Sequence, residues 1–137
     1  MERRAALADI EDLIVIRGAV VENRLANPAS VSRADYEWFV GQGRVWLREV
    51  AGRIAGFSAG DPRDGSIWAL FMHPDFEGQG MGASLLHRVC EDLRADGYRE
   101  IWLSTDPGTR ADRLYRRLGW KDRGLLPSGE RKFILPL

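Results

Sequence analysis

EGQGMGASLL, residues 77–86, places Gly78, Gly80 and Gly82 on alternate positions directly ahead of a run with helical spacing. Glycine costs about 1 kcal/mol relative to alanine inside a helix, so three glycines here need a reason. A tight turn that requires positive φ explains one or two of them. The alternative is that bare N–H groups at a helix N-terminus converge on an anion, which the helix dipole also favours. The stretch therefore predicts an anion-binding turn that opens a helix.

The segments around this turn predict a strand before it and a helix after it. SIWALFM, residues 66–72, is a nearly continuous apolar run, as expected for a strand buried on both faces. Residues 80–95 carry the apolar stripe of a long helix that ends near Gly97, and residues 99–105 form the next strand. The helix N-terminus then lies at the carboxyl end of a strand, where open α/β sheets bind ligands.

The remaining segments alternate between helical and extended patterns. Ser32 and Asp35 resemble a capping box at the start of a second helix. The expected helices are 8–23, 32–42 and 109–119, and the expected strands are the hairpin 44–50 and 53–60 and two strands within 120–137. This order of elements predicts a layered α/β domain.

Composition limits the class of protein. The 137 residues are the usual size of one domain, and a 45% hydrophobic content is enough for one core, so we expect a single domain over residues 1–137. Lys plus Arg and Asp plus Glu both number 20, and this zero net charge predicts neither a nucleic-acid nor a membrane partner. Any anion site must then be local.

The single cysteine and the absence of long apolar runs indicate a cellular compartment. Cys90 falls among the apolar residues of helix 80–95, so we expect it to pack in the core of a protein kept under reducing conditions. The N-terminus is too interrupted by charges to form a signal peptide, and no apolar run approaches 18 residues. These features predict a soluble, cytoplasmic protein.

Two other phosphate-binding motifs fit the sequence poorly or not at all. GQGMGA, residues 78–83, formally satisfies the dinucleotide pattern G-x-G-x-x-A. However, three features argue against a dinucleotide-binding fold. Five residues separate Met72 from Gly78, and the acidic residue Glu100 begins the next strand instead of ending it. Only about 55 residues follow the motif, too few for the second half of such a fold. A Walker loop is excluded because the chain contains no Gly-Lys-Ser or Gly-Lys-Thr.

Two stretches together resemble the GCN5-related N-acetyltransferases, a resemblance that spans most of the chain. They are MHPDFEGQGMGASLL, residues 72–86, and GTRADRLYRRLGW, residues 108–120. The resemblance implies a mixed central sheet flanked by about four helices and an acetyl-CoA cosubstrate. It also implies that main-chain N–H groups of residues 78–83 hold the pyrophosphate, that Phe71 and Met72 pair with the pantetheine arm, and that Tyr115 is the general acid. The implied cofactor-binding set is Phe71, Met72, Gly78, Gln79, Gly80, Met81, Gly82, Ala83, Gly108 and Tyr115.

The sequence departs from the family pattern at two positions. Glu77 stands where the family prefers Arg or Gln, and Gly108 stands where it often has Asn. A water-exposed carboxylate about 5 Å from a phosphate repels it by roughly 1 kcal/mol, which weakens binding by less than tenfold. If Glu77 turns outward, this penalty mostly disappears.

The expected reaction is direct attack of a primary amine, from a small molecule or peptide, on acetyl-CoA in a ternary complex. It needs a neutral amine, a docked acyl group, a donor for the oxyanion and a proton for the thiolate. A backbone N–H of strand 66–72 is a candidate oxyanion donor. For the base we prefer Glu22, with Glu49, His73 or water alone as alternatives. The rival hypothesis is a sensor that binds acyl-CoA without turnover.

Acceptor recognition, metal binding and assembly are the least specified features. Asn23, Arg24 and Trp68 are candidate acceptor-binding residues, and an arginine there would suit an acceptor with a carboxylate or phosphate. We expect no metal site. The terminal segment KFILPL, residues 132–137, could pair across a homodimer or lie within one sheet.

Overall fold

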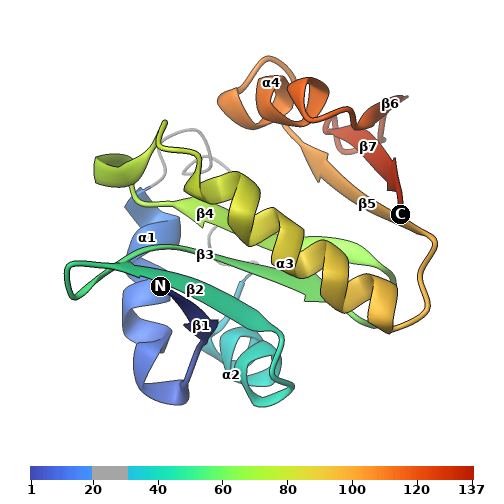
Figure 1. The fold of residues 1–137 in the computed structure, drawn as a ribbon. Coiled ribbons are helices and arrows are strands. Elements are labelled where there is room, and N and C mark those ends of the chain that lie inside the picture. Colours follow the sequence, from blue (N-terminus) through green and yellow to red (C-terminus); the bar gives the residue numbers. More distant parts are fainter. Residues whose placement is uncertain (20–30) are drawn as a thin grey trace.

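The computed structural model describes residues 1–19 and 31–137, which form one seven-stranded sheet with α-helices on its two faces (Figure 1). The strands lie in the order β1-β2-β3-β4-β5-β7-β6, and only the β4/β5 pair is parallel. The strands are β1 (Glu2–Arg4), β2 (Val45–Val50), β3 (Arg53–Asp61), β4 (Ser66–Met72), β5 (Glu100–Thr105), β6 (Lys121–Leu125) and β7 (Arg131–Pro136). The helices are α1 (Ile10–Ala19), α2 (Arg33–Gly41), α3 (Met81–Ala95) and α4 (Arg110–Arg117), with 3-10 turns at Leu7–Asp9 and Pro74–Phe76.

Two apolar cores form, one on each side of the sheet. Alternation along β3 directs Phe57 and Ala59 toward α1 and α2, whereas the hydroxyl of Ser58 donates to the carbonyl of Leu85 in α3, 2.9 Å away. The second core joins α3 to α4, β5 and β7, and it includes Cys90, whose thiol pKa burial raises. The expectation of a core cysteine is confirmed.

Most of the expected helices and strands are present, and local sequence features explain where they begin. The capping box at α2 is confirmed: the side chain of Ser32 accepts from the N–H of Asp35, and the Asp35 carboxylate accepts from the N–H of Ser32. The expected helix 8–23 begins later, at Ile10, after a 3-10 turn, and residues 20–30 lie outside the described part of the chain.

Three features differ from the sequence-based expectations or resolve an open alternative. The short polar strand β1, which was not predicted, pairs along β2. Strand β4 is not buried on both faces, because only Ala69 and Phe71 of its seven residues are buried. The terminal segment lies within one sheet: β7 pairs with β5 on one edge and with β6 on the other, so it is not a free edge for a second copy.

The topology rules out the dinucleotide-binding fold, whose sheet is mostly parallel. Within residues 1–19 and 31–137, no group of three His, Cys, Asp or Glu side chains is arranged to hold a metal ion. None of the helices in those same ranges is long and apolar enough to cross a membrane.

Candidate active site

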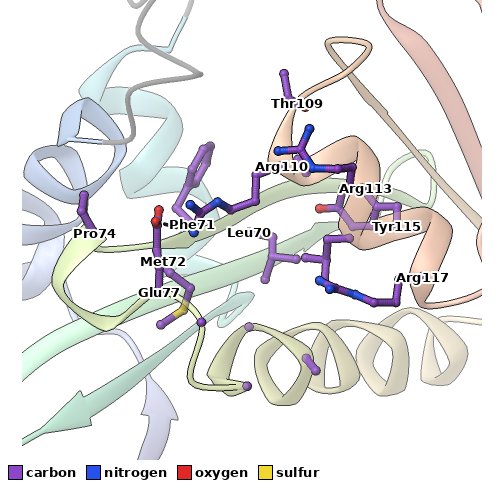
Figure 2. A pocket seen from close by; sticks show the side chains of 16 residues that line it. Leu70, Phe71, Met72, Pro74, Glu77, Thr109, Arg110, Arg113, Tyr115 and Arg117 are labelled. Atoms are coloured by element: carbon purple, nitrogen blue, oxygen red, sulfur yellow. Dashed lines mark hydrogen bonds and ion pairs between the residues drawn. The ribbon is translucent and has the colours of Figure 1, made fainter.

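The site is an opening between β4 and β5. Only one register pair, Ser66 with Trp102, joins these strands, and beyond it they separate toward their carboxyl ends. A cavity of about 730 Å³, a typical size for a small-molecule site, occupies the gap between β4, α3 and α4 (Figure 2). It is lined by Leu70, Phe71, Met72, Pro74, Glu77, Gly78, Gly80, Gly82, Ala83, Thr109, Arg110, Ala111, Arg113, Leu114, Tyr115 and Arg117.

The separated edge of β4 offers backbone hydrogen-bonding groups to this cavity. The N–H of His73 donates to the carbonyl of Ala55 on β3 at 2.8 Å, which fixes the alternation of the antiparallel ladder. Phe71, two residues earlier, therefore directs its N–H and C=O toward β3. Leu70 and Met72 direct theirs toward the opening, where an extended ligand can pair with them as a missing strand would.

The three glycines of the turn have different structural reasons. Gly78 and Gly80 adopt the left-handed region, with φ values of 78° and 79°, and Gly80 is the N-cap of α3. Gly82 has no such φ, and a Cβ there would meet only the Cγ of Met72, at an ordinary 3.7 Å. Neither backbone conformation nor packing therefore requires glycine at position 82, but a side chain there would enter the cavity.

An ion pair crosses the mouth of the cavity. Nη1 of Arg110, in the first turn of α4, lies 2.7 Å from Oε2 of Glu77, in the segment that follows β4 (Figure 2). The two residues come from opposite walls of the opening. The carboxylate that departs from the expected motif is thus neutralised by an arginine 33 residues away in sequence.

Tyr115 reaches the cavity from α4. Its ring packs against Trp120 and Phe133, with centroid distances of 5.3 and 6.1 Å, and the residue is 5% exposed. Burial raises the pKa of its phenol well above the usual range, so the hydroxyl stays protonated at neutral pH. No described residue hydrogen bonds to that hydroxyl, which leaves its proton available to a ligand.

The model of the Acetyltransferase (GNAT) family matches residues 13–120. The chain belongs to this family. It is an acetyltransferase built on the mixed sheet that the family resemblance implied, with the separated β4 and β5 strands at its centre.

Relatives and solved structures agree with this assignment. The chain is 29% identical over 147 residues to the L-methionine sulfoximine/L-methionine sulfone acetyltransferase of Pseudomonas paraeruginosa, covering 96% of this chain and 86% of that protein. It is 34% identical over 77 residues to an uncharacterized N-acetyltransferase of Mycobacterium tuberculosis, covering 53% of this chain and 49% of the relative.

Two solved structures share the fold at low identity. A putative acetyltransferase from Salmonella typhimurium, solved with its cofactor acetyl-CoA, has a TM-score of 0.82 at 22% identity, covering 100% of this chain and 93% of that one. A ribosomal-protein-alanine N-acetyltransferase from Brucella melitensis has a TM-score of 0.79 at 22% identity, covering 100% and 99%.

The GNAT chain brings most of the expected cofactor-binding residues to one cavity. Its lining includes Phe71, Met72, Gly78, Gly80, Gly82, Ala83 and Tyr115. It does not include Gln79, Met81 or Gly108. Of the acceptor candidates, Trp68 stacks on Phe39 on the opposite face of β4, with a centroid distance of 4.1 Å, and does not line this cavity. Glu22, Asn23 and Arg24 lie outside the described residues.

The two described base candidates have other partners. The carboxylate of Glu49, on β2, accepts from Nε of Arg3 at 2.6 Å. Nδ1 of His73 accepts from the N–H of Asp75 at 3.1 Å and caps the 3-10 turn that follows β4. His73 therefore caps the turn at the end of β4. Neither residue lines the cavity.

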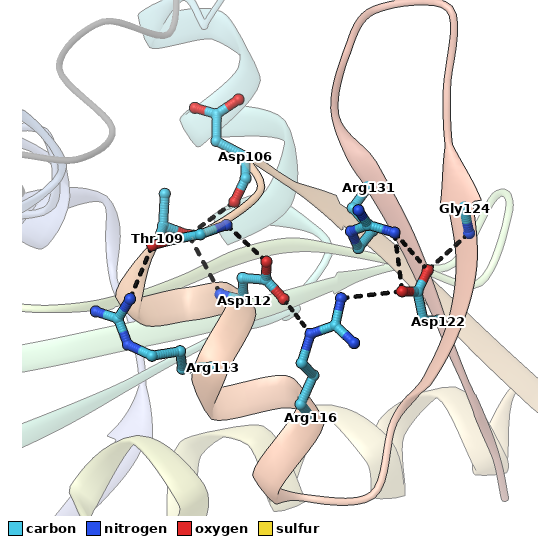
Figure 3. Close-up of polar contacts among 9 residues, drawn as sticks. Asp106, Thr109, Asp112, Arg113, Arg116, Asp122, Gly124 and Arg131 are labelled. Carbon is cyan, nitrogen blue, oxygen red and sulfur yellow. Dashed lines mark hydrogen bonds and ion pairs between the residues drawn. The ribbon is translucent and has the colours of Figure 1, made fainter.

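A polar network that the sequence did not reveal holds α4, and with it Tyr115, in place (Figure 3). We call it the α4 anchor, and it comprises Asp106, Gly108, Thr109, Asp112, Arg113, Arg116, Asp122, Gly124 and Arg131. The Asp112 carboxylate accepts from the N–H of Gly108 at 2.7 Å and from Nε of Arg116 at 2.7 Å, and these two bonds lower its pKa. The sequence carries two local signals of this network, the T-x-x-D cap at Thr109 and the i,i+4 spacing of Asp112 and Arg116.

Asp122 connects the α4 anchor to the C-terminal strands. Its carboxylate accepts from the N–H of Gly124 at 2.7 Å, and Arg131 and Arg116 donate to it at 2.8 and 2.9 Å. These contacts, led by the Gly124 N–H, lower its pKa from 3.8 to about 2. A lowered folded-state pKa contributes stability above the unfolded value, and this contribution is lost as the pH falls through the folded value.

We therefore expect Asp122→Asn to lower the melting temperature at pH 7 by several degrees. The variant should also lose less stability than the wild type between about pH 4 and pH 2, since it lacks the titrating carboxylate. Melting curves at pH 7, 4 and 3 measure both effects. Asp12→Asn, at an exposed carboxylate of α1, is the matched control, and equal pH slopes for the wild type and Asp122→Asn would contradict the prediction.

Proposed function

We propose that this GNAT protein transfers the acetyl group of acetyl-CoA to a primary amine of a small molecule or peptide, by direct attack in a ternary complex. The observation that carries the proposal is the separation of β4 from β5 beside a glycine turn and a buried tyrosine. The solved relative with acetyl-CoA and the Pseudomonas acetyltransferase, whose named substrates are amino-acid analogues, support it.

The described residues fit each part of such a donor. The pantetheine arm carries amides that can pair with the backbone groups of Leu70 and Met72 along the open edge of β4. Pyrophosphate oxygens suit the main-chain N–H groups at the N-terminus of α3, which Gly78, Gly80 and Gly82 leave uncovered. We therefore assign pantetheine pairing to Leu70 and Met72 in place of the expected Phe71 and Met72, because the N–H and C=O of Phe71 face β3. We expect Phe71 to contribute its ring.

The chemistry divides between the backbone and one side chain. The acceptor nitrogen forms a bond to the acetyl carbon, the carbon–sulfur bond breaks, and the departing sulfur takes the proton of the Tyr115 hydroxyl. We assign the oxyanion role to whichever of the Leu70 and Met72 N–H groups does not pair with pantetheine, and it donates to the carbonyl oxygen as its charge grows. Burial raises the pKa of the Tyr115 phenol, so its proton is still on the hydroxyl when the thiolate forms. We assign to Glu22 the role of the base that accepts the amine proton.

A sensor would bind acyl-CoA in the same cavity but would not catalyse acetyl transfer. Calorimetric titration with acetyl-CoA, using NAD as the control, tests the donor, and release of free thiol with a panel of amines tests transfer. We expect 1:1 binding of acetyl-CoA, no binding of NAD, and amine-dependent thiol release. Binding without release for every amine would favour the sensor, and no binding at near-millimolar acetyl-CoA would refute both hypotheses.

The ion pair between Glu77 and Arg110 leads to a prediction about donor affinity. Glu77→Gln removes the negative charge beside the glycine turn, so we expect acetyl-CoA to bind up to tenfold more tightly. Arg110→Gln leaves the Glu77 carboxylate without this ion pair and should weaken binding by a similar factor. Both effects should shrink at high salt because the ion pair is partly exposed. Titrations of the two variants and the double variant at 50 and 500 mM salt measure this. Equal affinities at low salt would show that the pair has no influence on the donor.

A further inference from the structure

Arg17, in α1, has an unsatisfied hydrogen-bonding group. Its Nη1 is buried and finds no hydrogen-bond partner, and no carboxylate of the described residues forms an ion pair with it. Such a donor is costly to bury, since it has given up water without a replacement. A buried guanidinium donor without a hydrogen-bond partner is able to bind an anionic group.

Aromatic rings fix the position of this guanidinium. Its Cζ lies 4.6 Å from the ring centroid of Phe71 and 5.2 Å from that of Trp68. Trp68 reaches this face because β4 carries one extra residue there: Ala59 pairs with Ala69, but the next residue of β3, Gly60, pairs with Ile67. The bulge places Trp68 and Phe71 on the same face of β4.

Phe71 connects Arg17 to the cavity. Phe71 lines the cavity between β4 and β5. Its ring stacks against the Arg17 guanidinium on the face of the sheet that α1 and α2 cover. The glycine turn and α3 lie on the opposite face. An acceptor held by Arg17 would therefore approach the end of β4 from the side opposite to the proposed pyrophosphate site.

We propose that Arg17 binds a carboxylate of the acceptor, so that the acetylated amine belongs to an amino acid or a similar amino carboxylate. This inference rests on the proposed function and names the substrate class of the same site. A guanidinium pairs with a carboxylate through parallel hydrogen bonds, and its single charge matches that of one carboxylate. Arg63, another arginine stacked on this aromatic face, is already paired with Asp61 at 2.8 Å.

Matched acceptors test the proposal directly. L-Methionine sulfone and its primary carboxamide differ in the carboxylate alone. We expect kcat/KM of the wild type to be roughly tenfold or more higher for the acid, since the amide leaves the buried donor without its charged partner. Arg17→Met should remove this preference by lowering kcat/KM for the acid only, and Arg17→Lys should restore part of it because the charge returns without the fork.

Controls separate a binding role from a structural one. Arg63→Met removes a stacked arginine from the same aromatic face and should leave the acid-to-amide ratio unchanged. Acetyl-CoA affinity should be equal in Arg17→Met and the wild type. A wild type that uses both acceptors equally, or an Arg17→Met variant that loses both equally, would overturn the inference.

A binding experiment keeps this inference separate from the proposed function. Protein saturated with CoA is titrated calorimetrically with L-methionine sulfone, which requires no turnover. We expect saturable binding to the wild type and none to Arg17→Met. If amines without a carboxylate are acetylated while neither protein binds the acid, the transfer activity stands and the carboxylate site is refuted. If the acid binds in an Arg17-dependent way but no amine is acetylated, the proposed transfer fails instead.

Discussion

Replacing Tyr115 with phenylalanine will lower turnover on the order of 100-fold, the usual contribution of a general acid. The affinity for acetyl-CoA should stay nearly unchanged, because the ring contacts with Trp120 and Phe133 remain. The substitution breaks no internal bond, since no described residue hydrogen bonds to the hydroxyl. Thiol release under saturating acetyl-CoA measures the first quantity and calorimetry the second.

Tyr98→Phe is the matched control for this loss. The Tyr98 hydroxyl donates to the carbonyl of Pro62 at 2.7 Å, away from the cavity, so its removal should lower stability and leave turnover nearly intact. The raised pKa of Tyr115 leads to a second expectation. The turnover rate of the wild type should not decrease through loss of the Tyr115 proton at any pH below 10, since the phenol remains protonated there. Equal turnover of Tyr115→Phe and the wild type would remove this residue from the mechanism.

The sequence predicted those elements that local patterns determine. The capping box at Ser32, the stripe of α3 and the glycine turn each depend on residues within a few positions of one another. The family resemblance then linked the turn to Tyr115, and the structure places both on one cavity. Strand β1 was not predicted because its three residues are all polar and show no alternation. Only their pairing with β2 defines them as a strand.

The features that make the site depend on contacts between distant residues. The separation of β4 from β5 reflects a register that no periodicity encodes, and it explains why β4 is less buried than an apolar run predicts. From the sequence alone, Glu77 is expected to repel a phosphate, whereas in the structure it forms an ion pair with Arg110. The burial of the Arg17 donor likewise could not be predicted from the sequence, because it depends on the rings of Trp68 and Phe71, which are distant in sequence. Helical spacing alone makes this arginine an unremarkable residue of α1.

Gly82→Leu will weaken acetyl-CoA binding by about 100-fold or more, which corresponds to about 2.7 kcal/mol. Position 82 is the second residue of α3, and glycine is a poorer helix former than alanine or leucine. Neither φ nor packing requires glycine there, since an added Cβ meets only Met72 at 3.7 Å. The larger side chain would enter the cavity and cover the main chain at the helix N-terminus. Binding and stability should therefore change in opposite directions.

This opposition makes the experiment decisive. Calorimetry should detect little or no acetyl-CoA binding to Gly82→Leu, while its melting temperature without ligand equals or exceeds that of the wild type. Gly41→Leu is the matched control, because Gly41 is also helical and has open space around its Cβ, but it lies in α2 away from the cavity. It should bind acetyl-CoA like the wild type. If Gly82→Leu still binds normally, the main chain of the turn is not the anion site; if it unfolds, Gly82 has a structural role that its surroundings do not indicate.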